Sequence, residues 1–299
     1  MSGNILSAEK TALKKLKTQL SISDTQAEIS AFGAELQSLI VGGKERIWTA
    51  EEQWWPRHSP VLFPRVGKSK GNQIEVDGKA YPMNQHGFAR DMAFEKVESA
   101  DSHAQTYRLY DSGETLARFP FPFELELTYS LLKDGIHVRY QVINPGNRPL
   151  PFSLGAHPGF LLPAGGFKEL NMQFSEDENL ERHLLEDGLF NGQTESLGSG
   201  KILPLSVDLF NKDAIVLKAL NSRKVELIGP DIHLEMQFGG FEDFGIWTKK
   251  SCETFLCLEP WYGYADSTDE SEREGLHLLE PGKTFEAFWQ VRFMDSALA

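Results

Sequence analysis

The sequence contains very little cysteine and no long apolar run. Its two cysteines, Cys252 and Cys257, are an odd number of residues apart in an expected strand, which places them on opposite faces of it. We therefore expect buried free thiols and no disulfide, and two thiols are too few for a four-cysteine zinc site. No stretch of about 18 apolar residues is present, so no membrane span is expected. The N-terminus lacks the basic and apolar regions of a signal peptide, and the expected location is cytoplasmic.

Positive charge is also scarce. The 299 residues include 30 Lys and Arg against 43 Asp and Glu, which gives a formal net charge of −13. Nucleic acids and anionic membranes would repel such a chain, so neither is an expected partner. The sequence leaves the oligomeric state open. Glycine and proline are frequent instead, with 26 and 15 residues, which indicates many turns and few long helices.

Strict alternation of apolar and polar residues is the strongest local pattern. It covers residues 123–129, 136–142, 232–238 and, less regularly, 288–293. A period of two is typical of half-buried strands. Asp134-Gly135 and Asp77-Gly78 are expected to join neighbouring strands as hairpins. Because no long helical segments separate the strands, the sequence predicts an all-β protein, a large antiparallel β-sandwich.

The domain organisation follows from the same pattern. Alternation continues from about residue 21 to residue 293 without a Ser/Gly-rich linker, which predicts a single domain over residues 21–299. Helical periodicity is limited to the stretch from Ala8 to Leu20. We expect residues 1–20 to form a leader with helical character outside the main fold.

Two of the eight histidines lie in loops of the kind that forms binding pockets. His86 lies in the segment Met83–Arg90 and His157 in Ser153–Phe160, each with adjacent glycines and a nearby phenylalanine. Glycine permits close approach of a ligand, and phenylalanine supplies an apolar wall. From this pattern alone, a pocket residue and a hydrogen-bonded structural histidine are equally open interpretations.

A carboxylate follows an apolar strand near the C-terminus. Glu259 comes directly after the apolar residues 255–258 and precedes Pro260 and a cluster of aromatic residues that includes Trp261. Partial desolvation there is expected to raise the pKa of Glu259 towards neutrality, and aromatic rings commonly pack against the C–H faces of sugars. The alternative is a structural carboxylate that accepts hydrogen bonds from nearby backbone N–H groups.

Together these segments resemble a known family. Asn84–Phe88, Gly155–Phe160 and Leu258–Gly263 resemble, in this order, motifs of the aldose 1-epimerases, the galactose mutarotase family. The similarity is greatest to the LacX-like branch, which further segments also match: Ala34–Leu39, Trp55–Pro64 and Val76–Lys79. The resemblance extends over roughly residues 20–293. It implies the large antiparallel β-sandwich of that family, the galactose mutarotase-like supersandwich.

The resemblance also implies an activity, the interconversion of the α and β anomers of a hexose. In that reaction Glu259 is the general base for the C1 hydroxyl, His157 is the general acid for the ring oxygen, and His86 polarises the sugar near the ring oxygen. The ring opens to the aldehyde, the C1–C2 bond rotates, and the ring closes again. This chemistry requires neither cofactor nor metal, and the sequence contains no nucleotide-binding or metal-ligand motif.

Further substrate-binding residues are implied by position. The aspartate that binds sugar hydroxyls in the family corresponds best to Asp213, with Asp208 as the competitor. An arginine of the family that precedes the Asp-Gly hairpin corresponds to Lys68 by counting or to Arg65 by residue type. Lysine does not replace a bidentate arginine clamp. Trp261 is the expected sugar platform.

Three alternatives remain open at this stage. A sugar-phosphate 1-epimerase could use a basic stretch formed by Arg57, His58, Arg65, Lys68 and Lys70. A non-catalytic sugar-binding protein of the same fold would not need an acid–base pair, which counts against it. A glycoside hydrolase ranks third, because it requires two facing carboxylates and the sequence offers only Glu259 and Asp213.

Overall fold

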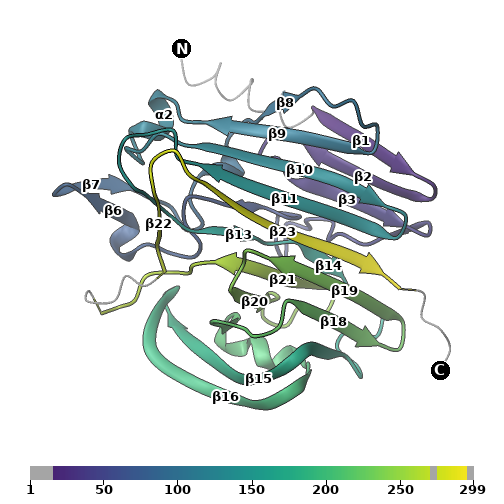
Figure 1. The fold of residues 1–299 in the computed structure, drawn as a ribbon. Helices are drawn as coiled ribbons and strands as arrows, with labels where there is room; N and C mark the ends of the chain where they lie inside the picture. Colours follow the sequence, from purple (N-terminus) through teal and green to yellow (C-terminus); the bar gives the residue numbers. More distant parts are fainter. Residues whose placement is uncertain (1–15, 270–274, 295–299) are drawn as a thin grey trace.

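The computed structural model describes residues 16–269 and 275–294, and strands make up most of them (Figure 1). The helical elements in these residues are short: α2 (Gly113–Leu116), η1 (Lys70–Asn72), η2 (Ala89–Asp91) and η3 (Val207–Lys212). The predicted all-β class and antiparallel sheets are therefore confirmed. No helix in the described part of the chain is long and apolar enough to cross a membrane.

One layer is a nine-stranded antiparallel sheet (Figure 1). Its strands, in spatial order, are β16 (Leu189–Pro204), β15 (Asn171–Glu186), β18 (Lys224–Gly229), β19 (Ile232–Gly239), β23 (Thr284–Phe293), β11 (Gly135–Ile143), β10 (Glu124–Leu132), β9 (Ala104–Tyr110) and β8 (Glu95–Val97). The long β15–β16 hairpin forms one end of this layer.

Two smaller sheets lie behind the large one. A six-stranded sheet contains β17 (Ile215–Leu217), β20 (Asp243–Trp247), β21 (Phe255–Tyr262), β13 (Leu154–Ala156), β5 (Val61–Leu62) and β14 (Gly159–Leu161). A four-stranded sheet contains β1 (Lys17–Ile22), β2 (Thr25–Ser30), β3 (Leu36–Val41) and β4 (Lys44–Glu45). Two short pairs complete the fold: β6 (Gln73–Val76) with β7 (Lys79–Pro82), and β12 (Leu150–Phe152) with β22 (His277–Leu279).

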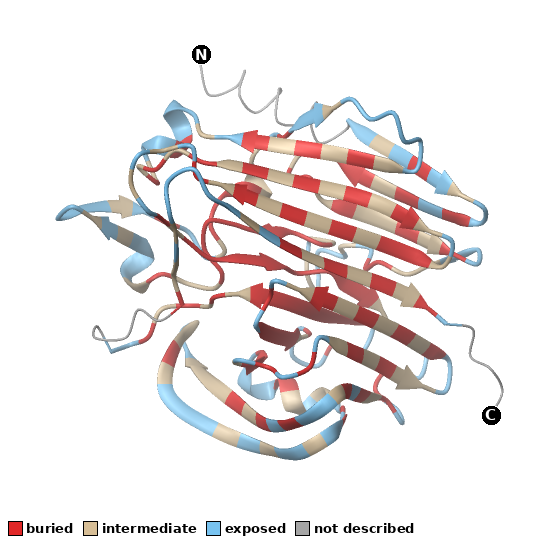
Figure 2. Cartoon of the chain, viewed as in Figure 1, coloured by how far each residue is buried: buried red, intermediate tan, exposed pale blue. Residues whose placement is uncertain are grey.

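The core lies between the layers. Figure 2 shows buried and half-buried residues alternating along β10, β11 and β23 of the large sheet. Leu125, Leu127 and Tyr129 of β10 are buried, as the alternating sequence predicts. β21 differs, because seven of its eight residues are buried and both of its faces are covered. Each large apolar side chain removed from water contributes about 1.5–3 kcal/mol to stability.

Both predicted hairpins are present, but one of them turns a residue earlier than expected. Asp77 and Gly78 have φ values of 52° and 74° and connect β6 to β7, as a two-residue turn of this type requires. In the β10–β11 hairpin, Leu132 pairs with Gly135, so the two turn residues precede the glycine. A Cβ on Gly135 would lie 1.9 Å from the Val291 carbonyl oxygen. This glycine therefore permits close strand packing.

The predicted leader needs a correction. Lys17–Leu20 belongs to β1, which pairs with β2 so that Leu20 lies opposite Ala27, and both side chains are buried. The helical periodicity was thus overridden by a cross-strand pairing that buries Leu20. The rest of the expected helix lies outside the described residues. Both cysteines are free and buried, as predicted, although Cys252 precedes β21 instead of lying in a strand.

Candidate active site

A cavity of about 360 Å³ brings together the three predicted catalytic residues. His86, His157 and Glu259 all line it, together with Asp213 and Trp261. Its other walls come from several loops and from the β15–β16 hairpin: Trp54, Trp55, Gln85, Arg90, Leu185, Gly188, Phe190, Trp247 and Lys249. The site is thus built where β21 meets residues far from it in the sequence.

Glu259 occupies the buried strand β21 and is 1% exposed. On a strand, residues two apart point to the same side, so Trp261 faces the same cavity. Gly245 of β20 pairs with Glu259, and its missing side chain leaves room for the ring of Trp261. Burial raises the pKa of Glu259 well above its ordinary value, and the nearby Asp213 carboxylate raises it further. The expected desolvation of this carboxylate is therefore present.

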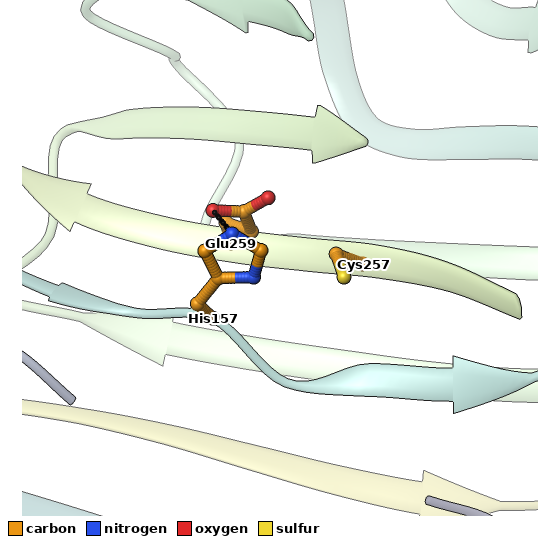
Figure 3. A group of neighbouring side chains, drawn as sticks. All are labelled: His157, Cys257 and Glu259. Atoms are coloured by element: carbon orange, nitrogen blue, oxygen red, sulfur yellow. Dashed lines mark ion pairs between the residues drawn. The ribbon is translucent and has the colours of Figure 1, made fainter. Parts of the chain in front are cut away.

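His157 lies between β13 and β14 and faces Glu259. Its Nε2 is 3.3 Å from Glu259 Oε2. A dashed line in Figure 3 marks this pair. Trp55 stacks on the imidazole with ring centroids 4.7 Å apart, and the edges of Trp247 and His86 approach it, each at 5.7 Å. Burial lowers the pKa of His157 to about 3, and the positive charge of Arg90 adds to this effect.

The two opposite pKa shifts have the same consequence for charge. The raised pKa of Glu259 favours the neutral carboxyl group, and the lowered pKa of His157 favours the neutral imidazole. Transfer of the carboxyl proton across the 3.3 Å contact gives a carboxylate and an imidazolium without changing the net charge. The pair can thus supply a base and an acid at the same time.

His86 is fixed by two backbone hydrogen bonds to one residue. Its own N–H donates to the Gly67 carbonyl oxygen at 2.7 Å, and its Nδ1 accepts from the Gly67 N–H at 3.1 Å. Burial lowers the pKa of His86 well below its ordinary value, and the positive charge of Arg90 lowers it further. Because Nδ1 accepts a hydrogen bond from Gly67, the neutral ring has its proton on Nε2, which becomes a hydrogen-bond donor. A Cβ on the next residue, Gly87, would lie 2.2 Å from the Phe63 carbonyl oxygen, which explains the glycine there.

Asp213 is the aspartate that lines the cavity, and Asp208 does not line it. Asp213 follows η3 with φ of 75°, a conformation that aspartate adopts only when its surroundings hold it. The guanidinium of Arg182 donates to the Asp213 carbonyl oxygen at 2.5 Å and to the Leu209 carbonyl oxygen at 2.7 Å. Asp208 instead accepts a hydrogen bond from Asn211 at 3.1 Å.

The structure places neither Arg65 nor Lys68 in the lining of this cavity. Arg65 is buried, forms an ion pair with Asp266, and lines a separate cleft of about 780 Å³ next to β6. Lys68 donates from Nζ to the Asp187 carbonyl oxygen at 2.9 Å. The cavity has a different arginine, Arg90, which donates to the Gln85 carbonyl oxygen at 2.7 Å. We expected Arg65 or Lys68 at this position, and the structure instead places Arg90 in the lining of the cavity.

Several functional candidates are not evident from the sequence. Arg90 belongs to the same Met83–Arg90 segment as His86, and the η2 turn brings it back to the cavity. Burial lowers the pKa of Arg90 to about 10, so it stays charged at neutral pH. Trp55 and Trp247 were not predicted, although Trp55 begins a matching segment. Trp261 lines the cavity as expected, with its ring packed over Gly155 and Gly245.

The basic stretch of the sugar-phosphate alternative is dispersed in the fold. Arg57 pairs with Asp91 at 2.9 Å, and His58 Nδ1 contacts the Trp48 carbonyl oxygen at 2.7 Å. Lys70 lines the same separate cleft as Arg65. These residues therefore do not converge on one phosphate site.

Comparisons with known proteins agree with this geometry. The family model described as aldose 1-epimerase matches residues 17–292. The plasmid-encoded protein LacX of Lactococcus lactis subsp. lactis is 29% identical over 259 residues, covering 81% of this chain and 86% of LacX. The predicted resemblance to the LacX-like branch is thereby confirmed.

Solved structures show the same fold. A galactose mutarotase-like protein from Lactobacillus casei ATCC 334 superimposes with a TM-score of 0.87 at 32% identity, covering 93% of this chain and all of that one. A galactose mutarotase related enzyme from Lactobacillus acidophilus has a TM-score of 0.86 at 29% identity, covering 94% and 98% of the two chains. From the family match over nearly all of its length, we conclude that this chain belongs to the aldose 1-epimerase family.

Proposed function

We propose that the protein is a mutarotase that interconverts the α and β anomers of a hexose, with Glu259 as the general base and His157 as the general acid. The observation that carries this proposal is the buried Glu259–His157 pair, with 3.3 Å between Oε2 and Nε2, in the wall of a cavity. Both reacting oxygens of a sugar hemiacetal are bonded to C1. An adjacent acid and base therefore match the two proton transfers that ring opening requires.

The reaction begins when the proton of Glu259 passes to His157. The Glu259 carboxylate then takes the proton of the C1 hydroxyl, the bond between C1 and the ring oxygen breaks, and His157 protonates the ring oxygen. The products are the open-chain aldehyde, a carboxylic acid and a neutral imidazole. After the C1–C2 bond rotates, the same transfers run in reverse and close the ring on the other face.

Other cavity residues would hold the sugar. The Nε2–H of neutral His86 can donate to the ring oxygen, and its ring is 5.7 Å from that of His157. The side-chain amide of Gln85, 3.4 Å from the same Nε2, is the group that the sugar would displace. The exposed carboxylate of Asp213 can accept from sugar hydroxyls, and Arg90 can donate to them. Trp261 and Trp55 supply apolar walls for the C–H groups. A small-molecule sugar is the proposed partner, and a cytoplasmic location stays a prediction.

NMR exchange or polarimetry on freshly dissolved α-glucose and α-galactose tests the activity. We expect the protein to accelerate the approach to anomeric equilibrium over the uncatalysed control. If both sugars bind but neither equilibrates faster, the chain is a non-catalytic sugar-binding protein towards them.

One observation keeps the sugar-phosphate epimerase as a second candidate. Lys249 is exposed and lines the cavity together with Arg90, so two cations face the substrate space. The same exchange assay with the hexose 6-phosphates decides between the two substrates. A higher kcat/KM for the phosphate that falls to the level of the free sugar in Lys249→Gln would support this second function, and an unchanged ratio would exclude a role of Lys249.

A further inference from the structure

Cys257 is a buried thiol that the proposed reaction does not use. It lies two residues before Glu259 on β21, so its side chain points to the same side of the strand. The ligand-type atoms of His157, Cys257 and Glu259 all lie within 4.8 Å of one another. Figure 3 shows the three side chains as neighbours. The exposed fractions of these residues are 7%, 0% and 1%. A nitrogen, a sulfur and an oxygen ligand thus converge in a desolvated place.

Polar atoms of this cluster are poorly satisfied. Nδ1 of His157 is buried without a hydrogen-bond partner, and the buried Oε2 of Glu259 makes no hydrogen bond of good geometry, its nearest described polar neighbour being His157 Nε2 at 3.3 Å. An unsatisfied buried polar group costs about 1–3 kcal/mol. Glu259 and His157 also line the cavity, which provides a path from solvent to the cluster.

The donor set selects the kind of cation. Thiolate, imidazole and carboxylate together suit Zn²⁺, whereas Mg²⁺ and Ca²⁺ prefer oxygen ligands alone. Ligands at about 2.0–2.3 Å from a tetrahedral ion lie about 3.3–3.8 Å apart, so these side chains must close by about 1 Å. The fourth position would face the cavity.

Binding of Zn²⁺ displaces two protons. The ion replaces the thiol proton of Cys257 and the carboxyl proton of Glu259, and both protons leave to solvent. The resulting thiolate and carboxylate neutralise the ion. The positive charges of Arg90 and Arg57, which act on His157, oppose binding and limit its affinity.

We propose that His157, Cys257 and Glu259 form a binding site for one thiophilic divalent cation, Zn²⁺ by its chemistry, and that the bound ion blocks the acid–base pair. The blocking step rests on the proposed function, whereas the binding step does not.

Equilibrium dialysis with Zn²⁺ and absorption spectroscopy with Co²⁺ test the binding. We expect one Zn²⁺ per chain and a near-ultraviolet thiolate-to-Co²⁺ band in the wild type. Cys257→Ser should weaken binding by about tenfold or more and remove the band. Cys252→Ala is the matched control, because Cys252 is also buried and its Sγ contacts Thr254 Oγ1, at 3.2 Å. This variant should bind as the wild type does.

The exchange assay tests the consequence. Zn²⁺ should slow anomer exchange in the wild type and in Cys252→Ala, EDTA should restore it, and Mg²⁺ should have no effect. Cys257→Ser should retain its exchange rate in the presence of Zn²⁺. The proposal is wrong if the wild type binds no Zn²⁺ at micromolar concentration, or if Cys257→Ser binds it equally well. If the wild-type protein has no mutarotase activity, equilibrium dialysis and the Co²⁺ spectrum still decide whether it binds the cation.

Discussion

Replacement of Arg182 by methionine would separate the positioning of Asp213 from the chemistry. Arg182 belongs to β15 and is 1% exposed, and it does not line the cavity. Its guanidinium donates to the carbonyl oxygens of Leu209 and Asp213, at 2.7 and 2.5 Å. These bonds fix the backbone at the end of η3, where Asp213 has a φ of 75°. Methionine removes both donors and keeps much of the side-chain volume.

The magnitude follows from these contacts. A hydrogen bond with a charged partner contributes about 1.5–3 kcal/mol, so the loss of two costs about 3–6 kcal/mol. The variant also relieves the strained backbone conformation of Asp213, which offsets about 1–3 kcal/mol of the cost of the two lost hydrogen bonds. We therefore expect the free energy of unfolding to fall by about 3 kcal/mol. Loss of one hydrogen bond between Asp213 and the sugar would raise KM by about tenfold, which corresponds to about 1.4 kcal/mol.

Urea denaturation and saturation kinetics of anomer exchange measure the two effects. KM should rise while kcat changes little, because Glu259 and His157 stay in place. Arg182→Lys should recover part of the effect on KM. Arg139→Met is the control, since Arg139 pairs at the surface with Glu286, at 2.6 Å, away from the cavity. If Arg182→Met lowers stability but leaves KM at the control value, Arg182 supports only the fold.

Three further predictions concern the surroundings of the pair. Trp55→Leu removes the ring stacked on His157, which should lower kcat about fivefold; an unchanged kcat in saturated NMR exchange would exclude this role. Arg90→Met removes a positive charge that lowers the pKa values of His86 and His157. NMR titration of the variant should therefore give higher pKa values for both histidines, and unchanged pKa values would contradict the electrostatic account. Stability should fall as the pH drops below about 6.5, because the unfolded chain protonates His86 and His157 while the fold holds them neutral. The Tm of His86→Gln, compared at pH 7 and pH 5, should depend less on pH, and an equal dependence would refute this assignment.

The strands were predictable because their periodicity is local. Alternation in β10 and β11 shows directly which side chains face the core. The N-terminal error has a tertiary cause, since the pairing of β1 with β2 buries Leu20 and overrides helical periodicity. The displaced turn has a similar cause. Gly135 is required by the Val291 carbonyl oxygen of a neighbouring strand, and no local pattern reveals that contact.

The site was predictable where a motif carries its own geometry. His157 and Glu259 belong to short segments that also contain the glycines and aromatic residues around them. The arginine was misplaced because counting along the chain gives no side-chain direction: Arg65 points into another cleft, and Arg90 returns to the cavity through η2. The bond between Arg182 and Asp213 joins residues 31 apart, so it emerges only in the folded chain.

The central claim is that Glu259 is the base of an anomer exchange reaction. Its most direct test is NMR exchange of α-glucose and α-galactose with Glu259→Gln, compared with Glu253→Gln, the same change at an exposed carboxylate outside the cavity. We predict that Glu259→Gln lowers kcat by about 10²–10⁴-fold with its fold intact, while Glu253→Gln retains the wild-type rate. Exchange at a near wild-type rate in Glu259→Gln would contradict the assignment of the base.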